Sequence, residues 1–157
     1  MEMFELQGEY MRKMSDEDFY RFCRDNPDLR IERNANGEIE IMSPTRNNTS
    51  RINFLISLQL CKWFEKNGMR GEAHGPDAGF TLPNKAMRGP DAAWISEERS
   101  FNLPKQDRKR FAHVCPDFVV ELKSDSDTVL RLHEKMQEWI ANGCRLAWLI
   151  DPEQEKV

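Results

Sequence analysis

A short apolar run that turns charged at its end, within residues 116–124, constrains the fold of this chain more than any other feature. Residues 118–120 read Phe-Val-Val, which is typical of a buried strand. Because side chains alternate along a strand, Glu121 and Lys123 point to one face and Leu122 points to the other, into a core. A carboxylate and an ammonium at the end of a buried strand are costly unless they are paired or used in function.

A helix and a second strand follow this segment. Apolar residues recur at three- and four-residue steps over residues 128–142, Gly143 is a typical helix stop, and residues 145–150 form another apolar run. This strand–helix–strand order favours parallel pairing of the two strands. The sequence therefore predicts an α/β fold with a mixed central sheet flanked by helices. A length of 157 residues suits one domain, so we expect 1–157 to be a single domain in which residues 1–14 have no clear pattern.

Two helices and a hairpin are expected upstream. The first helix begins at a Ser15 cap and ends near residue 26. Residues 29–33 and 38–42 alternate between apolar and polar around an Asn-Gly pair, which predicts a β-hairpin. Residues 49–67 carry apolar side chains at helical spacing and predict a long amphipathic helix.

The charged side chains of these elements have ordinary interpretations. Glu32, Glu38 and Glu40 share one face of the hairpin, and a solvated acidic face is the interpretation we favour. Glu40 can alternatively supply an outer carboxylate to a metal site. Lys135, in the helix after the central strand, is expected to be exposed.

A second acid lies upstream of the central strand. Asp91 follows a Gly-Pro turn at the start of a short strand, so Asp91 and Glu121 can lie on neighbouring strands. Two such carboxylates can hold Mg²⁺ or Mn²⁺, with the Leu122 carbonyl as a further oxygen ligand. Lys123 can then orient water or offset charge on a phosphate, which are the parts of metal-assisted phosphodiester hydrolysis. The alternative is a pair of strand-end ion pairs, and the Asp…Glu-x-Lys pattern alone does not decide between them.

The overall charge limits how nucleic acid can bind. The formal net charge is −4, which does not favour broad electrostatic binding of DNA and leaves only local basic groups for that purpose. Candidates for contacts with a DNA backbone are Arg46, Arg51, Lys105, Arg108, Lys109 and Arg110. Solvated surface charge is the alternative interpretation for each of them.

Cysteine usage and hydropathy suggest an intracellular setting. The four cysteines are scattered without a Cys-x-x-Cys pair, so neither a zinc site nor a disulfide framework is expected. No run of apolar residues is long enough for a membrane span or a signal segment, and we expect a cytoplasmic protein without a membrane partner.

Several segments together resemble the Uma-type family of putative restriction endonucleases, within the PD-(D/E)XK nuclease superfamily. They occur in the family's order and cover the chain from about Phe19 to Pro152. The segments are Ser-Pro-Thr at 43–45, Pro-Asp-Ala-Ala-Trp at 90–94, Pro-Asp-Phe-Val-Val-Glu-Leu-Lys-Ser at 116–124, Glu-Lys-Met-Gln-Glu at 134–138 and Ala-Trp-Leu-Ile-Asp-Pro at 147–152.

The resemblance implies a restriction-endonuclease-like core and a Mg²⁺-dependent DNA endonuclease. It implies Asp91 and Glu121 as metal ligands and Lys123 as the catalytic lysine. A catalytically inactive module of the same fold that binds DNA or protein is the alternative, as is a homo-oligomer in which these charges form interface ion pairs.

The chain departs from the family pattern at two places. Family members often place a Glu or His before the long helix, where this chain has Asn48 within residues 46–50. They also continue past residue 152 with a further strand pair that we expect this chain to lack. The sheet edge that this would expose favours association into a homodimer or a higher homo-oligomer.

Overall fold

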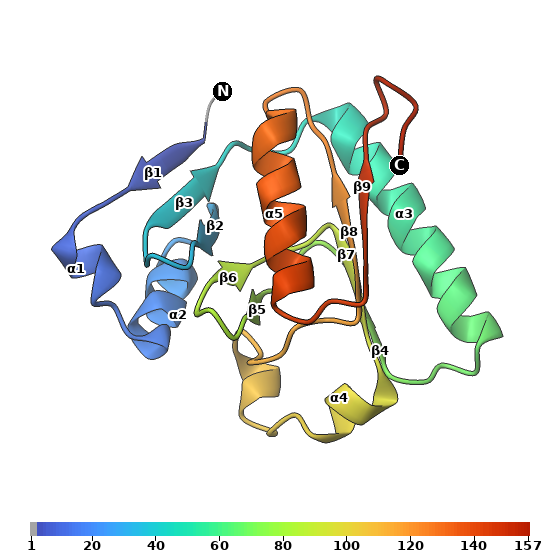
Figure 1. Ribbon diagram of the computed structural model, residues 1–157, viewed down its shortest axis with the longest axis horizontal. Coiled ribbons are helices and arrows are strands. Elements are labelled where there is room, and N and C mark those ends of the chain that lie inside the picture. Colours follow the sequence, from blue (N-terminus) through green and yellow to red (C-terminus); the bar gives the residue numbers. More distant parts are fainter. Residues whose placement is uncertain (1–2) are drawn as a thin grey trace.

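The computed structural model describes residues 3–157, whose strands form two sheets (Figure 1). The strands are β1 (Phe4–Leu6), β2 (Arg30–Arg33), β3 (Ile39–Met42), β4 (Glu72–His74), β5 (Phe80–Thr81), β6 (Met87–Arg88), β7 (Ala92–Ile95), β8 (Phe118–Leu122) and β9 (Leu146–Ile150). The helices are α1 (Glu9–Arg12), α2 (Asp16–Asp25), α3 (Asn47–Lys66), α4 (Glu97–Phe101), the 3-10 helix η1 (Asp107–Lys109) and α5 (Val129–Ala141). One sheet has the order β1-β3-β2-β6-β5, and the other has the order β4-β7-β8-β9.

The predicted strand–helix–strand unit is β8, α5 and β9. β8 and β9 pair in parallel, with Phe118 opposite Leu146 and Leu122 opposite Ile150, whereas β7 pairs with β8 in the antiparallel direction. The sheet is therefore mixed, and the predicted fold class is confirmed. The helix begins at Thr128, whose side chain accepts a hydrogen bond from the Arg131 amide.

Helices α3 and α5 cover opposite faces of this mixed sheet. Val119 packs in a cluster with Trp139 of α5, whereas Val120 packs in a cluster with Leu60 of α3. Adjacent strand residues face opposite sides of a sheet, so the two clusters lie on its two faces. Trp139 has no exposed surface, which makes α5 the more deeply packed of the two helices at this point.

The predicted hairpin and first helix are also confirmed. β2 and β3 pair around a turn in which Gly37 has a φ of +83°, and the Ser15 side chain accepts a hydrogen bond from the Asp18 amide at the start of α2. The hairpin lies in the first sheet rather than in the mixed sheet. It pairs there with β6, a strand of two residues in a segment that was not predicted to form a strand. After β6 the chain crosses to β7 of the other sheet, and Asp91 stands at that crossing.

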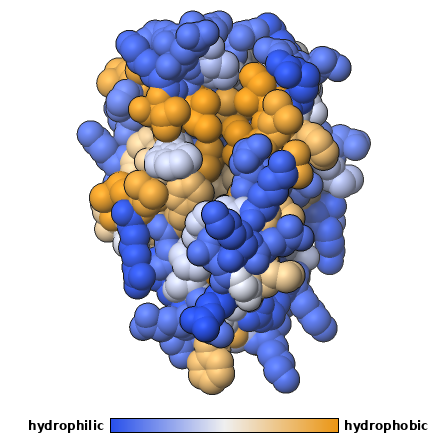
Figure 2. Space-filling view, turned by 90° about the vertical axis from the view of Figure 1, so that its right-hand side faces the viewer, coloured by the Kyte–Doolittle hydropathy of each residue, from blue (hydrophilic) through white to orange (hydrophobic). Residues whose placement is uncertain are grey.

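One side of the molecule exposes apolar side chains. Figure 2 shows them gathered on the side that carries α3 and β9. The exposed large apolar residues of these two elements are Phe54, Leu55, Leu58, Trp63, Leu146 and Trp148. β9 is also an edge strand of its sheet. Association of copies through this side stays a prediction. Within residues 3–157, no helix combines the length and the apolar character needed to cross a membrane.

Gly71 packs closely against the backbone just before β4, and its replacement tests this packing. It has a φ of +81°, and a Cβ at this position would lie 2.1 Å from the Ile95 carbonyl oxygen. We expect Gly71→Ala to lower the free energy of unfolding by about 2–3 kcal/mol, through backbone strain plus this clash. Gly68→Ala is the matched control, because Gly68 has a φ of +77° but open space around it, and it should cost only about 1 kcal/mol. Equal losses in urea unfolding would show that the contact has no energetic consequence.

Candidate functional site

Asp91 is fixed against the end of the central strand. Its backbone amide donates to the Val120 carbonyl at 3.0 Å, and its Oδ2 accepts a hydrogen bond from the Leu122 amide at 2.7 Å. These two bonds are to the residues before and after Glu121, so Asp91 and Glu121 lie at the same end of the mixed sheet. Both are buried, with 5% of Asp91 and 3% of Glu121 exposed.

Two further side chains hold the Asp91 carboxylate. Asn53 of α3 donates from Nδ2 to Oδ1 at 3.1 Å, and a guanidinium nitrogen of Arg30 on β2 lies 3.5 Å from the same oxygen. The same nitrogen donates to the Gly89 carbonyl at 3.0 Å. Sequence reasoning missed both residues. The available signal was an asparagine at position 53 on the buried stripe of α3, three residues before Ile56.

Glu121 is held by two residues one turn apart on α5. Trp139 Nε1 donates to Oε1 at 2.9 Å, and Lys135 Nζ lies 3.0 Å from Oε1 and 3.2 Å from Oε2. Burial raises the pKa of Glu121 to about 7, where Lys135 opposes the shift and the negative charges of Asp91 and Glu32 add to it. Burial lowers the pKa of Lys135, but Glu121 and Glu32 outweigh this effect and the net shift is upward.

The two lysines do not occupy the places expected from the sequence. Lys123 Nζ lies 3.1 Å from Glu153 Oε2, so its ammonium pairs with a carboxylate in the turn after β9. Lys135 was expected to be exposed, which is wrong: it is half-buried, and its ammonium lies between Glu121 and Glu32. It lies four residues before Trp139, on the face of α5 that packs against the sheet.

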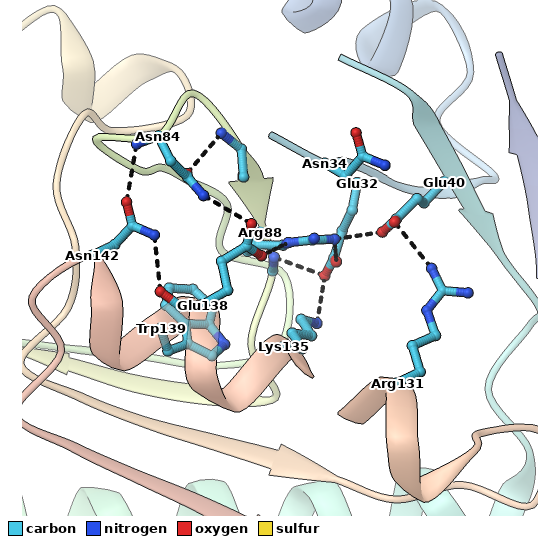
Figure 3. Close-up of polar contacts among 12 residues, drawn as sticks. Glu32, Asn34, Glu40, Asn84, Arg88, Arg131, Lys135, Glu138, Trp139 and Asn142 are labelled. Atoms are coloured by element: carbon cyan, nitrogen blue, oxygen red, sulfur yellow. Dashed lines mark hydrogen bonds and ion pairs between the residues drawn. The ribbon is translucent and has the colours of Figure 1, made fainter. Parts of the chain in front are cut away.

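The expected solvated face of the hairpin is also wrong, because Glu32 and Glu40 are buried in an ion-pair network. Figure 3 shows Arg88 of β6 between these two glutamates and Glu138 of α5. Arg88 Nη1 lies 3.2 Å from Glu32 Oε2 and contacts Glu40, while its Nε lies 2.5 Å from Glu138 Oε2. Arg131 adds a contact of 3.1 Å to Glu40. Cations from β6 and α5 therefore cover the acidic face of the hairpin.

Two cavities open beside these groups. Asp91 and Leu122 line a cavity of about 270 Å³, together with Arg30, the loop at 43–46 and the loop at 124–127. A second cavity of about 760 Å³ lies between the first sheet and α5 and is lined by the ion-pair network. The two cavities share lining residues, including Met42 and Ser126. Asp91 therefore borders a space that a substrate can enter.

The model of the Uma2 family, described as putative restriction endonuclease, matches residues 16–157. The chain belongs to the Uma2 family. The resemblance identified from the sequence motifs is thereby confirmed. A comparison with curated proteins gives no match.

This Uma2 chain is also similar to a solved structure, the crystal structure of a putative nuclease belonging to DUF820 from Anabaena variabilis ATCC 29413. The TM-score is 0.63 at 16% sequence identity, and the alignment covers 78% of this chain and 66% of that one. The chain thus spans slightly under two-thirds of the length of its structural neighbour. At this identity the similarity supports the fold.

The basic residues of the Uma2 chain fall into two groups. Arg46 lines the smaller cavity, where it lies 2.7 Å from Asp125, and Arg51 lies one turn into α3, bonded to Asn48. Arg46 therefore borders the same cavity as Asp91. Their contacts with DNA stay a prediction.

The second basic group, for which contact with a DNA backbone and solvated surface charge are both open interpretations, has contacts away from the acid pair. This group comprises Lys105, Arg108, Lys109 and Arg110. Arg108 pairs with Glu72, which lies opposite Ile95 at the end of β7 remote from Asp91. Arg110 pairs with Glu17 of α2. Local acids therefore hold two members of the group at the other end of the sheet.

The donor atoms at the acid pair fit a hard divalent cation. Within residues 3–157, no group of three or more His, Cys, Asp or Glu side chains is arranged to hold a metal ion. Mg²⁺ is commonly held by one or two carboxylates and completes its shell with water and phosphate oxygens, so two carboxylates suffice. The Oδ1 atom of Asn53, on the side chain that donates to Asp91, is buried and has no hydrogen-bond partner in the described part of the chain. It is a further oxygen donor beside Asp91.

Proposed function

We propose that this Uma2-family protein is a metal-dependent endonuclease that hydrolyses DNA phosphodiester bonds in the cavity beside Asp91. The supporting observation is the hydrogen bond between the Leu122 amide and Asp91, which joins the Asp91 carboxylate at the cavity wall to the strand end that carries Glu121. Two fixed carboxylates at one strand end, of which Asp91 lines the cavity, are the protein's share of a Mg²⁺ or Mn²⁺ site. The family description and the nuclease title of the structural neighbour agree with this proposal.

Each residue has a role in this proposal. Asp91 and Glu121 hold the cation, and the Leu122 carbonyl adds an oxygen. The bound cation would polarise a phosphoryl oxygen and acidify a water molecule. Asn53 fixes the Asp91 carboxylate, and Trp139 fixes that of Glu121, so neither has to reorganise during the reaction.

Lys123 is the lysine that we assign to charge stabilisation at the phosphate. It reaches the site only by leaving Glu153, whose side chain is 65% exposed. The Lys123 side chain is itself 11% exposed, so the ion pair is partly buried and a bound phosphate has to replace Glu153 as the partner of its ammonium. Arg30, which lines the cavity beside Asp91, is a second cation for the same phosphate.

Metal removal tests this function directly. Purified protein should nick or linearise plasmid DNA with Mg²⁺ or Mn²⁺, and chelation with EDTA should lower the rate by at least about 100-fold, because the Lewis acid is lost. Excess Mg²⁺ should restore the rate, as followed by agarose gel electrophoresis. Cleavage that continues unchanged in EDTA would contradict a metal-dependent mechanism.

A binding module without nuclease activity is the second candidate. The observation that favours it is that both acids already have cationic neighbours, Arg30 beside Asp91 and Lys135 beside Glu121. A calorimetric titration with Mn²⁺ separates the two functions. The nuclease requires heat of binding that Asp91→Ala abolishes, whereas a module without a metal site gives none.

A further inference from the structure

The ammonium of Lys135 has two carboxylates within reach at once. Its Nζ lies 3.0 and 3.2 Å from the two oxygens of Glu121 and 2.9 Å from Oε1 of Glu32. Figure 3 shows the contact with Glu32 on the side of the Arg88 network. Because the side chain of Lys135 is only 13% exposed, water does not replace either partner easily. The ammonium can therefore leave one carboxylate only while the other retains it.

Both carboxylates are held independently of Lys135. Trp139 Nε1 donates to Glu121 at 2.9 Å, so Glu121 keeps its position when the ammonium moves away. Glu32 accepts a hydrogen bond from the Gly89 amide at 2.9 Å and pairs with Arg88 at 3.2 Å. The carboxylates of Glu121 and Glu32 therefore keep their positions whichever of the two the Lys135 ammonium contacts.

We infer that the ammonium of Lys135 competes with the divalent cation for the Glu121 carboxylate. Glu32 retains the ammonium when the metal binds. This inference rests on the proposed function, because it takes Asp91 and Glu121 as the metal ligands. A divalent cation and an ammonium repel each other strongly at contact distances in a site of low dielectric constant. Metal binding therefore requires the ammonium to give up Glu121 and to remain with Glu32.

The competition predicts changes of opposite sign when Lys135 and its second carboxylate partner, Glu32, are replaced. Lys135→Met removes the competitor and should tighten Mn²⁺ binding by about tenfold or more. Glu32→Gln removes the negative charge of the second carboxylate. The Lys135 ammonium then stays with Glu121, and Mn²⁺ should bind several-fold more weakly. If Lys135 only organised the site, its removal would weaken metal binding. The sign for Lys135→Met therefore separates the two roles.

The experiment is isothermal titration of the full chain with Mn²⁺ near neutral pH. Lys135→Arg keeps the positive charge and should bind Mn²⁺ as the wild type does. Arg131→Met is the matched control, because it removes one positive charge from the same helix but contacts Glu40 rather than Glu121. Circular dichroism and thermal melting verify the fold of each variant. Lys135→Gln and Glu32→Gln decide the question if Lys135→Met does not fold.

The outcomes separate this inference from the function on which it rests. Tighter binding by Lys135→Met or Lys135→Gln supports the inference, including the case in which only these variants bind measurably. Suppose the wild type binds Mn²⁺ and Asp91→Ala abolishes binding, but removal of Lys135 leaves the affinity equal or lower. The metal site then stands and the competitor role is overturned. If neither the wild type nor any Lys135 variant binds Mn²⁺, both proposals fail.

Discussion

Asp91→Asn and Glu121→Gln should each lower Mg²⁺-dependent cleavage of plasmid DNA by at least about 10²–10³-fold. Each substitution keeps the shape of the side chain and removes the charge that would hold the cation. Lys123→Ala should lower the rate by about 100-fold, the usual contribution of one positioned side chain. Initial rates on supercoiled plasmid under saturating Mg²⁺ give the comparison. Losses of this size in all three variants would assign the reaction to this end of the sheet.

Asp125→Asn is the matched control for the two acids. Asp125 lines the cavity beside Asp91, but it contacts the exposed Arg46. Loss of its charge should therefore change the rate by no more than about threefold. Thermal melting establishes that every variant is folded. Wild-type rates in Asp91→Asn, Glu121→Gln and Lys123→Ala would remove these residues from any catalytic role and leave the binding module as the function to pursue.

The sequence predicted those parts of the fold that depend on local patterns. The apolar run at 118–120 and the helix after it are visible as periodicities, and a helix between two strands leads to parallel pairing of β8 with β9. The position of Asp91 was predictable for the same reason, since it follows a turn at the start of a strand. The two acids lie at one end of the sheet because β7 and β8 are antiparallel, so the start of β7 is beside the end of β8.

The parts that sequence reasoning missed depend on partners far away in the chain. Glu32 and Glu40 alternate with apolar residues as a solvated face would, and only Arg88 and the cations of α5 make their burial possible. Lys135 likewise has its partner Glu32 more than 100 residues away. Alternation along a strand shows which side chains share a face and does not show what covers that face. The direction of Lys123 was unpredictable because Glu153 belongs to a turn after β9.

Arg88→Met should lower the free energy of unfolding by about 3–5 kcal/mol, because it leaves buried carboxylates without their shared cation. The Arg88 side chain is 10% exposed and contacts Glu32, Glu40 and Glu138, which come from β2, β3 and α5. These contacts join the first sheet to the helix that holds Glu121. Urea unfolding at neutral pH, followed by circular dichroism, measures the loss.

The pH dependence of this loss identifies its electrostatic origin. Burial alone would raise the pKa of Glu32, but Lys135, Arg88 and two hydrogen bonds outweigh it and lower the pKa to about 2. An acid with a lowered pKa in the folded state stabilises the protein above its unfolded pKa of 4.5, and this stability is lost as the pH falls from there toward 2. Without Arg88 the pKa of Glu32 should be higher, so the variant has less stability to lose in acid. The difference between wild type and Arg88→Met should therefore shrink as the pH falls below about 4.5.

Arg131→Met is the control that separates a buried cation from an exposed one. Arg131 also contacts Glu40, but its side chain is 40% exposed, so its loss should cost less than about 1 kcal/mol. Equal destabilisation by Arg88→Met and Arg131→Met would show that burial of the network does not contribute to the free energy of unfolding. A loss for Arg88→Met that stays constant from pH 7 to pH 3 would point to lost packing rather than to uncompensated charge. The predicted pattern, a large loss at neutral pH that declines in acid for Arg88 alone, requires Glu32 to be ionised inside the fold.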